Sequence, residues 1–146
     1  MALNRKATAT WSGTGKEGSG AVSTTSGVLK DTPHSFNTRF VSEDGRAGTN
    51  PEELIAAAHA SCFTMKLSFV LNAAGFTADK LACTATVTMD KVGDGMGVVG
   101  IHLDVNGAVP GIDAEKFKAC AEDAKANCPI SQLLRSVPIT LSAALA

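Results

Sequence analysis

The sequence lacks the excess positive charge and the aromatic side chains that nucleic-acid-binding domains use. Among 146 residues, 13 Lys and Arg stand against 14 Asp and Glu, which gives a net charge of -1 at pH 7. Aromatic residues make up 5% of the chain, and Tyr is missing altogether. Binding to nucleic acid or to an anionic membrane surface therefore has no electrostatic or stacking support.

Signals for secretion and for membrane insertion are also missing. Residues 1–6 contain no apolar core of a signal peptide, and no later run approaches the ~18 apolar residues of a membrane span. We therefore expect a cytoplasmic protein with no membrane partner. In that compartment cysteines are thiols unless they are catalytic or bind a metal. The chain has four of them: Cys62, Cys83, Cys120 and Cys128.

Several motifs with known chemistry are absent. The glycine-rich segment 12–20 lacks the Gly-Lys-Ser/Thr ending of a phosphate-binding loop, and no helical pattern follows it. There is no Gly-x-Ser-x-Gly hydrolase motif and no Cys-x-x-Cys pair. What remains is a globular composition, 45% hydrophobic and 18% charged, that predicts one domain over residues 1–146.

Hydrophobic patterning predicts an α+β fold, because strands and helices cluster along the chain instead of alternating strictly. Strands are expected at 7–11, 21–24 and 36–40, as a hairpin of 81–89 with 98–105, and at 137–141; helices are expected at 50–74, 113–127 and 129–134.

The helix over 50–74 has the clearest boundaries. Asn50 is an N-cap before Pro51, Glu53 can complete a capping box, and Gly75 is a natural stop. At 100° per residue one stripe faces a core or an interface. Its members are Leu54, Ile55, Ala58, Cys62, Met65 and Phe69.

The four cysteines differ in their expected surroundings. Cys83 lies in an apolar strand and Cys120 in an amphipathic helix, so both are expected to be buried side chains. Cys128 precedes Pro129 as the N-cap of a short helix, where the helix dipole stabilises a thiolate. Cys62 is in mid-helix, and from spacing alone it is either a nucleophile that needs a nearby cation or a core residue.

Two other readings stay open at this point. His59 lies one turn before Cys62, so a metal site made of His59, Cys62 and Cys128 is conceivable, although the spacing is not that of known zinc modules. Alternatively, the cysteines are incidental, and an interface pocket binds or carries a small apolar ligand without catalysis.

A set of motifs in register resembles the osmotically inducible protein C (OsmC) family. The motifs are Ser26-Gly-Val-Leu29 with Phe36-Asn-Thr-Arg-Phe40, Gly48-Thr-Asn-Pro-Glu-Glu-Leu54, Ala57-Ala-His-Ala-Ser-Cys-Phe63, Val109-Pro-Gly-Ile112 and Asn127-Cys-Pro-Ile-Ser131. The resemblance runs from Thr8 to Leu141. It implies a thiol peroxidase of organic hydroperoxides, with antiparallel strands around a long central helix, working as an intertwined homodimer.

The resemblance also implies roles for individual residues. Cys62 corresponds to the peroxidatic cysteine and Cys128 to the resolving one, Arg39 to the cation that stabilises the thiolate, and Glu52 to the carboxylate that orients the arginine. The related organic hydroperoxide resistance branch takes its arginine from the N-terminal turn, where this chain has Lys16. We therefore favour the OsmC branch and Arg39.

These residue types suit the implied chemistry. An apolar lining would favour an alkyl tail over hydrogen peroxide, and we assign it to Met65, Phe69, Ile130 and Leu133. No cofactor or metal is expected, but an external dithiol, either a lipoylated protein or a thioredoxin-like one, has to reduce the disulfide.

Helix geometry adds a reason to expect a dimer. Glu52 and Cys62 are ten residues apart, hence about 15 Å along a straight helix, and they point about 80° apart. Two copies of the helix that cross antiparallel near Ala57 would bring each Glu52 towards the partner's cysteine. The alanines around that point, residues 56–58 and 60, are small enough for close packing. The alternative is that this alanine run faces the sheet of its own subunit.

Overall fold

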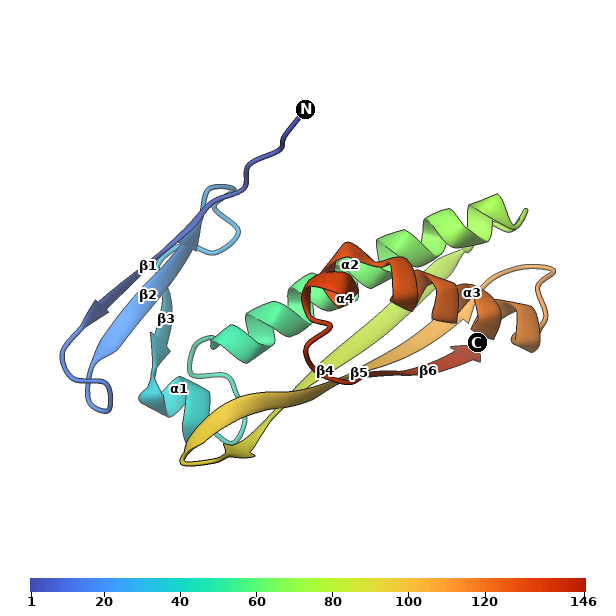
Figure 1. Cartoon of the computed structure of the whole chain (residues 1–146). Coiled ribbons are helices and arrows are strands. Elements are labelled where there is room, and N and C mark those ends of the chain that lie inside the picture. Colours follow the sequence, from blue (N-terminus) through green and yellow to red (C-terminus); the bar gives the residue numbers. More distant parts are fainter. The chain divides into compact units, whose positions relative to one another are not determined.

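The computed structural model describes residues 1–146 as two compact units, Met1–Leu54 and Ile55–Ala146. The expected α+β fold is confirmed: two three-stranded sheets are combined with one long helix and three shorter ones (Figure 1). Whether residues 1–146 act as a single domain stays a prediction.

The first unit contains an antiparallel sheet in the order β1-β2-β3, formed by β1 (Ala7–Ser12), β2 (Ser19–Thr24) and β3 (Thr32–Ser35). The glycine-rich segment forms the turn between β1 and β2, as expected. All six residues of β1 are exposed within the chain.

The strand expected at 36–40 is wrong, because α1 (Phe36–Phe40) is a helix. Ser35 caps it: its hydroxyl accepts from the Thr38 N–H, and the Thr38 hydroxyl accepts from the Ser35 N–H. The alternation of Phe36, Thr38 and Phe40 imitates a strand. In the helix the two phenylalanines lie one turn apart, with ring centroids 4.9 Å from each other.

The long helix α2 (Pro51–Ala73) begins and ends where its signals predict. Asn50 Oδ1 accepts from the Glu53 N–H at 2.9 Å, and Gly75 adopts φ +88° after the last turn, a conformation that side chains disfavour. The Glu53 carboxylate departs from the expected capping box, since it accepts from the Thr49 hydroxyl at 2.7 Å.

The second unit contains a sheet in the order β4-β5-β6, formed by β4 (Lys80–Val92), β5 (Gly95–Ala108) and β6 (Ile139–Leu145). The β4–β5 hairpin is antiparallel as predicted, but β6 runs parallel to β5, and it begins two residues later and ends four residues later than expected. The parallel pairing arises because α3 (Ala114–Asn127) and α4 (Pro129–Leu133) carry the chain back between the two strands.

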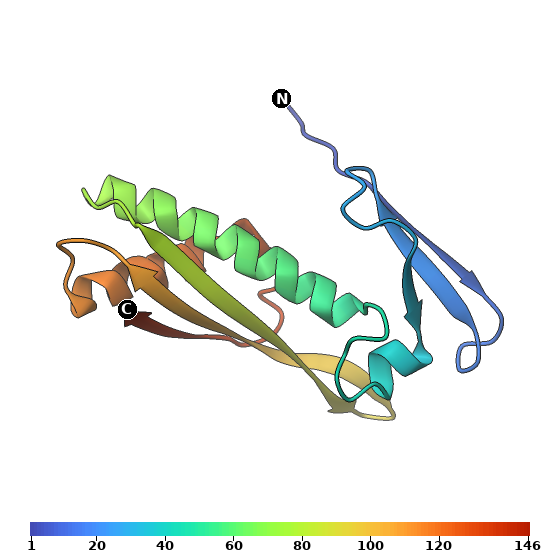
Figure 2. The same cartoon turned by 180° about the vertical axis from the view of Figure 1, so that it is seen from behind.

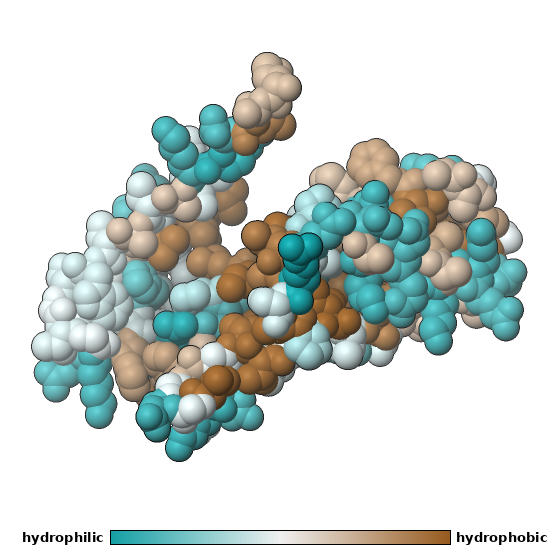
Figure 3. Space-filling model, in the orientation of Figure 1, coloured by the Kyte–Doolittle hydropathy of each residue, from teal (hydrophilic) through white to brown (hydrophobic).

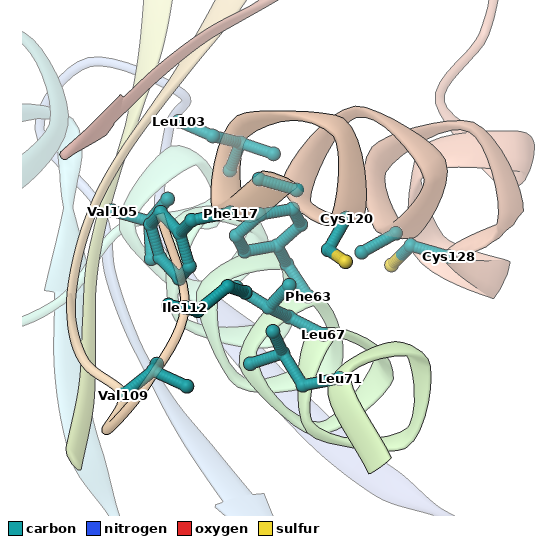
Figure 4. Close-up of a cluster of buried hydrophobic side chains, with 12 residues drawn as sticks. Phe63, Leu67, Leu71, Leu103, Val105, Val109, Ile112, Phe117, Cys120 and Cys128 are labelled. Carbon is teal, nitrogen blue, oxygen red and sulfur yellow. The ribbon is translucent and has the colours of Figure 1, made fainter. Parts of the chain in front are cut away.

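The core of the second unit lies between one face of this sheet and the helices (Figure 4). Its buried side chains come from α2 (Phe63, Leu67, Leu71), β5 (Leu103, Val105) and α3 (Phe117, Cys120, Ala121, Ala124). Gly107 in β5 lets the Phe117 ring approach closely, because a Cβ there would lie 2.5 Å from the ring. Alternate residues of β5 point to the other face, which no helix of this unit covers (Figure 2).

The buried face of α2 differs from the stripe expected from the sequence. The buried residues are His59, Phe63, Leu67 and Leu71, whereas Met65 is 62% exposed and Phe69 is 65% exposed. Cys62 is half-buried. The helix is apolar on nearly every side, so periodicity could not identify the face that its own chain covers.

By length and composition α2 could also cross a membrane, since 18 of its residues have a mean hydropathy of 1.5. The expectation that no segment approaches a membrane span is therefore wrong. However, a core helix meets the same criterion, and Phe63, Leu67 and Leu71 of α2 are fully buried in the chain's own core. One side of α2 therefore belongs to the chain's own core.

Candidate functional site

Cys62 and Cys128, 66 residues apart in the sequence, come together in the second unit. Cys62 is half-buried in the middle of α2. Cys128 is fully buried between α3 and α4, where it is the N-cap of α4, as expected (Figure 4). The two side chains pack in the same cluster, and Cys128 is near enough to shift the pKa of Cys62. No disulfide is formed, since all four cysteines are free thiols.

The surroundings of Cys62 within the chain favour the neutral thiol. Burial raises the pKa of Cys62 above its ordinary value, the backbone N–H of Ile130 opposes this, and the Cys128 thiol raises it again. The Ile130 N–H lies in the first turn of α4, where N–H groups have no partner within the helix. None of the groups that shift this pKa is a cation, so a reactive thiolate needs positive charge from elsewhere.

Arg39 and Glu52 come together in the first unit. Arg39 Nη2 donates to Glu52 Oε1 at 2.7 Å, and Arg39 Nε donates to Oε2 at 3.2 Å. Arg39 is in the last turn of α1 and Glu52 in the first turn of α2. The two contacts fix the guanidinium plane, as bidentate pairs do. The guanidinium also lies 5.0 Å from the centre of the Phe40 ring.

A cavity of about 250 Å³ lies beside this ion pair in the first unit. Its lining includes Trp11, His34, Phe36 and Phe40 together with Arg39. The Trp11 and His34 rings are 5.3 Å apart. Arg39 thus combines a fixed positive charge with an adjacent aromatic cavity.

His59, buried one helical turn before Cys62, has a defined partner. His59 Nε2 and the Ser131 hydroxyl share a hydrogen bond of 2.8 Å, while Nδ1 is buried without one. Burial lowers the pKa of His59, which keeps the ring neutral near pH 7. The sequence makes His59 a conceivable metal ligand, and it gives no signal that Ser131 is its partner.

The other two cysteines lie in unreactive surroundings. Cys120 is buried in the core, as expected. Cys83 is half-buried in β4, and burial together with the nearby Asp104 charge raises its pKa to about 11. Cys83 is therefore a neutral thiol near pH 7, and both cysteines occupy structural positions.

The expected lining of Met65, Phe69, Ile130 and Leu133 is spread over α2 and α4. Ile130 packs against the core, whereas Leu133 is 74% exposed. Phe69 lines a groove between α2 and α3 together with Lys66 and Lys116. The role of these residues in binding substrate stays a prediction.

The alternative of a metal site finds no geometric support. No three His, Cys, Asp or Glu side chains in the chain are arranged to hold a metal ion. His59 Nε2, one of the two ring nitrogens that could ligate a metal, is instead hydrogen-bonded to the Ser131 hydroxyl.

Comparisons with known proteins identify the family. Residues 43–142 match the family described as OsmC-like protein. This chain is an OsmC-like protein. It is 51% identical over 136 residues to the protein of Escherichia coli named peroxiredoxin OsmC, a match that covers 93% of both chains. It is also 34% identical to the organic hydroperoxide resistance protein of Xanthomonas axonopodis pv. citri, over 68% of this chain and 70% of the relative.

Solved structures agree with the assignment to the OsmC-like family. The crystal structure of the organic hydroperoxide resistance protein OhrB of Bacillus subtilis superposes with a TM-score of 0.69 at 28% identity, covering 95% of this chain and 98% of that one. That of an organic hydroperoxide resistance protein OsmC from Legionella pneumophila gives a TM-score of 0.70 at 25% identity, covering 99% of both chains.

Proposed function

We infer that this OsmC-like protein is a thiol-dependent peroxidase that reduces organic hydroperoxides to alcohols. The observation that carries this inference is the pairing of Cys62 with Cys128 in a chain whose relatives are named peroxiredoxin and organic hydroperoxide resistance protein. A half-buried thiol beside a second, buried thiol is the arrangement that a two-step thiol oxidation needs.

We propose that Cys62 is the peroxidatic residue. Its thiolate attacks the distal oxygen of the hydroperoxide, the O–O bond breaks, and the alkoxide leaves as an alcohol after it takes up a proton. Cys62 is oxidised to a sulfenic acid, and the peroxide is reduced. Cys128 then attacks this sulfur, which forms the Cys62–Cys128 disulfide and releases water. An external dithiol returns both cysteines to thiols.

Arg39 is proposed as the cation that this chemistry requires. A guanidinium beside Cys62 would lower the pKa that burial raises, and it would stabilise the charge that develops on the peroxide oxygens. Glu52 acts as a positioning residue, because its two contacts hold the guanidinium in one plane. The aromatic cavity beside Arg39 supports an apolar substituent on the substrate.

The site is proposed to assemble in a homodimer. Within α2, Glu52 and Cys62 are about 15 Å apart along the axis, so Glu52 and its arginine serve a partner's Cys62 more readily than their own. Ala57, midway between them, is exposed. The exposed Met65 and Phe69 of α2, and the exposed Val92, Met96 and Val99 of the β4–β5 hairpin, supply apolar surface for the partner. Figure 3 shows hydrophobic surface (brown) along this hairpin.

The remaining assignments follow from the same chemistry. Met65, Phe69, Ile130 and Leu133 are proposed to contact the alkyl part of the substrate. The reductant is proposed to be a dithiol, either a lipoylated or a thioredoxin-like protein, and no bound cofactor takes part. We propose a cytoplasmic location, where such dithiols are kept reduced.

Steady-state consumption of peroxide tests this function. The purified protein is given an alkyl hydroperoxide or hydrogen peroxide, with dihydrolipoamide or a thioredoxin system as reductant. We expect faster turnover of the alkyl substrate, and no turnover by Cys62→Ser. A Cys62→Ser protein that still turns over the alkyl hydroperoxide would refute the proposed function.

A further inference from the structure

The buried His59–Ser131 hydrogen bond joins the same two helices as the cysteine pair. His59 is three residues before Cys62 on α2, and Ser131 is three residues after Cys128, at the N3 position of α4. Residues three apart are neighbours on one side of a helix. The two contacts therefore lie side by side, about one turn apart, and connect α2 with the start of α4.

The helix that carries Cys128 depends on such contacts. A helix of five residues has too few internal hydrogen bonds to be stable alone. Three of its residues, Pro129, Gln132 and Leu133, are exposed. The hydrogen bond from Ser131 to His59 connects this helix to α2, next to the weaker contact of the Ile130 N–H with the Cys62 sulfur. The Cys128 thiol itself makes no capping bond to the α4 backbone.

Burial of the His59 ring at this position costs free energy. It is fully buried, and Nδ1 has no hydrogen-bond partner. Buried polar atoms without partners are rare because they lose their hydration and gain nothing in exchange. An apolar side chain at this buried position would avoid this penalty. What the imidazole adds is the contact with Ser131.

We propose that His59, through Ser131, is a positioning residue that holds α4 where Cys128 can reach Cys62. The inference rests on the proposed function, and it concerns the resolving step alone. In that step the Cys128 thiolate attacks the sulfenic sulfur of Cys62, an S–S bond forms, and hydroxide leaves as water with the proton from Cys128. Displacement of α4 slows this attack far more than the first oxidation at Cys62, to which α4 contributes only the Ile130 N–H and part of the apolar lining.

A competing reaction makes the effect measurable. When the attack of Cys128 on the sulfenic acid is slow, a second hydroperoxide molecule oxidises the sulfenic acid of Cys62 to sulfinic acid. The partition between disulfide and sulfinic acid thus reports how well Cys128 is positioned. General damage to the site would slow the first oxidation as well and leave this partition unchanged.

The test compares matched substitutions at both ends of the hydrogen bond. Ser131→Ala removes the hydroxyl, and His59→Asn keeps an amide that is too short to reach it. His59→Gln carries its amide nitrogen where Nε2 lies and is expected to rescue the contact. Ser68→Ala is the control, since the Ser68 hydroxyl donates only to the Met65 carbonyl of its own helix.

Each reduced protein is mixed with one equivalent of an alkyl hydroperoxide, quenched with a sulfenic-acid trap, and mapped by mass spectrometry. In Ser131→Ala and His59→Asn we expect formation of the sulfenic acid within about twofold of wild type, but disulfide formation slowed roughly ten- to a hundredfold. With excess hydroperoxide these two variants accumulate sulfinic acid. His59→Gln and Ser68→Ala are expected to behave like wild type.

Failure of this inference differs from failure of the proposed function. If the wild-type protein forms no Cys62–Cys128 disulfide, the proposed function falls and the inference falls with it. If wild type forms the disulfide and both Ser131→Ala and His59→Asn form it at the same rate, only the role of His59 is refuted. An equal slowing of both steps also refutes it, because that result indicates a structural role without specific positioning.

Discussion

Arg39 and Glu52 are joined at two points, with Nη2 to Oε1 at 2.7 Å and Nε to Oε2 at 3.2 Å, so that the guanidinium has a fixed orientation. Cys62, in contrast, has a pKa that burial raises, and no cation is among the groups that shift it. The chain thus contains a guanidinium in a fixed orientation, and a thiol that needs a nearby cation to form a thiolate. The proposed dimer brings them together, and the predictions below test that arrangement.

The first prediction concerns the charge of Arg39. Arg39→Gln should raise the pKa of Cys62, and each unit of increase lowers the thiolate fraction near neutral pH about tenfold. The rate of Cys62 oxidation should therefore fall near neutral pH and recover as the pH rises. Glu52→Gln should change the rate in the same direction, by less. Stopped-flow oxidation over a range of pH measures this.

Arg46→Gln is the matched control for that experiment, because Arg46 is an exposed cation of the same unit outside the ion pair. If both arginine variants keep the pH profile of wild type, Arg39 does not stabilise the thiolate.

The second prediction concerns the dimer. Ala57→Arg adds a bulky cation at an exposed position of α2, which costs the isolated chain little but prevents close packing of two helices. We expect a monomeric, folded protein that has lost most of its peroxidase activity. Ala126→Arg, at an exposed position of α3, should remain an active dimer. Sedimentation and turnover are measured together, and a monomer with full activity would contradict the shared site.

The third prediction concerns Cys83. With its pKa raised to about 11, Cys83 is a neutral thiol near pH 7 and reacts slowly with peroxide and with alkylating reagents. Cys83→Ala should therefore leave peroxide consumption unchanged. Alkylation followed by mass spectrometry should label Cys62 first, and prior treatment with hydroperoxide should block that labelling. Loss of turnover in Cys83→Ala would overturn the assignment of roles.

The fourth prediction concerns acid stability. Burial lowers the pKa of His59 below its ordinary value of 6.5, so below that pH the unfolded chain binds a proton that the folded chain does not. The free energy of unfolding should then decrease as the pH falls from 6.5 towards the folded pKa, while His59 contributes no slope above 6.5. Denaturant titrations at one protein concentration, at about pH 7.5 and about pH 5.5, measure the slope.

His59→Gln should be less sensitive to acid across this range, whatever its stability at neutral pH. An identical slope in the two proteins would mean that His59 titrates normally when folded.

Local signals predicted much of the fold. Asn50, Pro51 and Gly75 gave the limits of α2, and Asp113 gave the start of α3, because capping depends on neighbouring residues. The strand expected at 36–40 failed, because Ser35 and Thr38 form a capping box that outweighs a short alternation. The buried face of α2 could not be predicted, since an apolar helix offers several faces and tertiary packing selects one.

The candidate site, like the fold, could be predicted from the sequence only in part. The resemblance to the OsmC family named Arg39, Glu52, Cys62 and Cys128, and the structure joins them as two pairs. The bond between His59 and Ser131 was beyond prediction, because it spans 72 residues and no local pattern encodes it.

Peptide mapping after one equivalent of an alkyl hydroperoxide tests the central claim most directly. The account predicts that two thiols are consumed and that the linked peptides contain Cys62 and Cys128, with Cys83 and Cys120 still reduced. In Cys128→Ser the same treatment should stop at a sulfenic acid on Cys62. A disulfide that contains Cys83 or Cys120, or a Cys62 that remains reduced, would contradict the account.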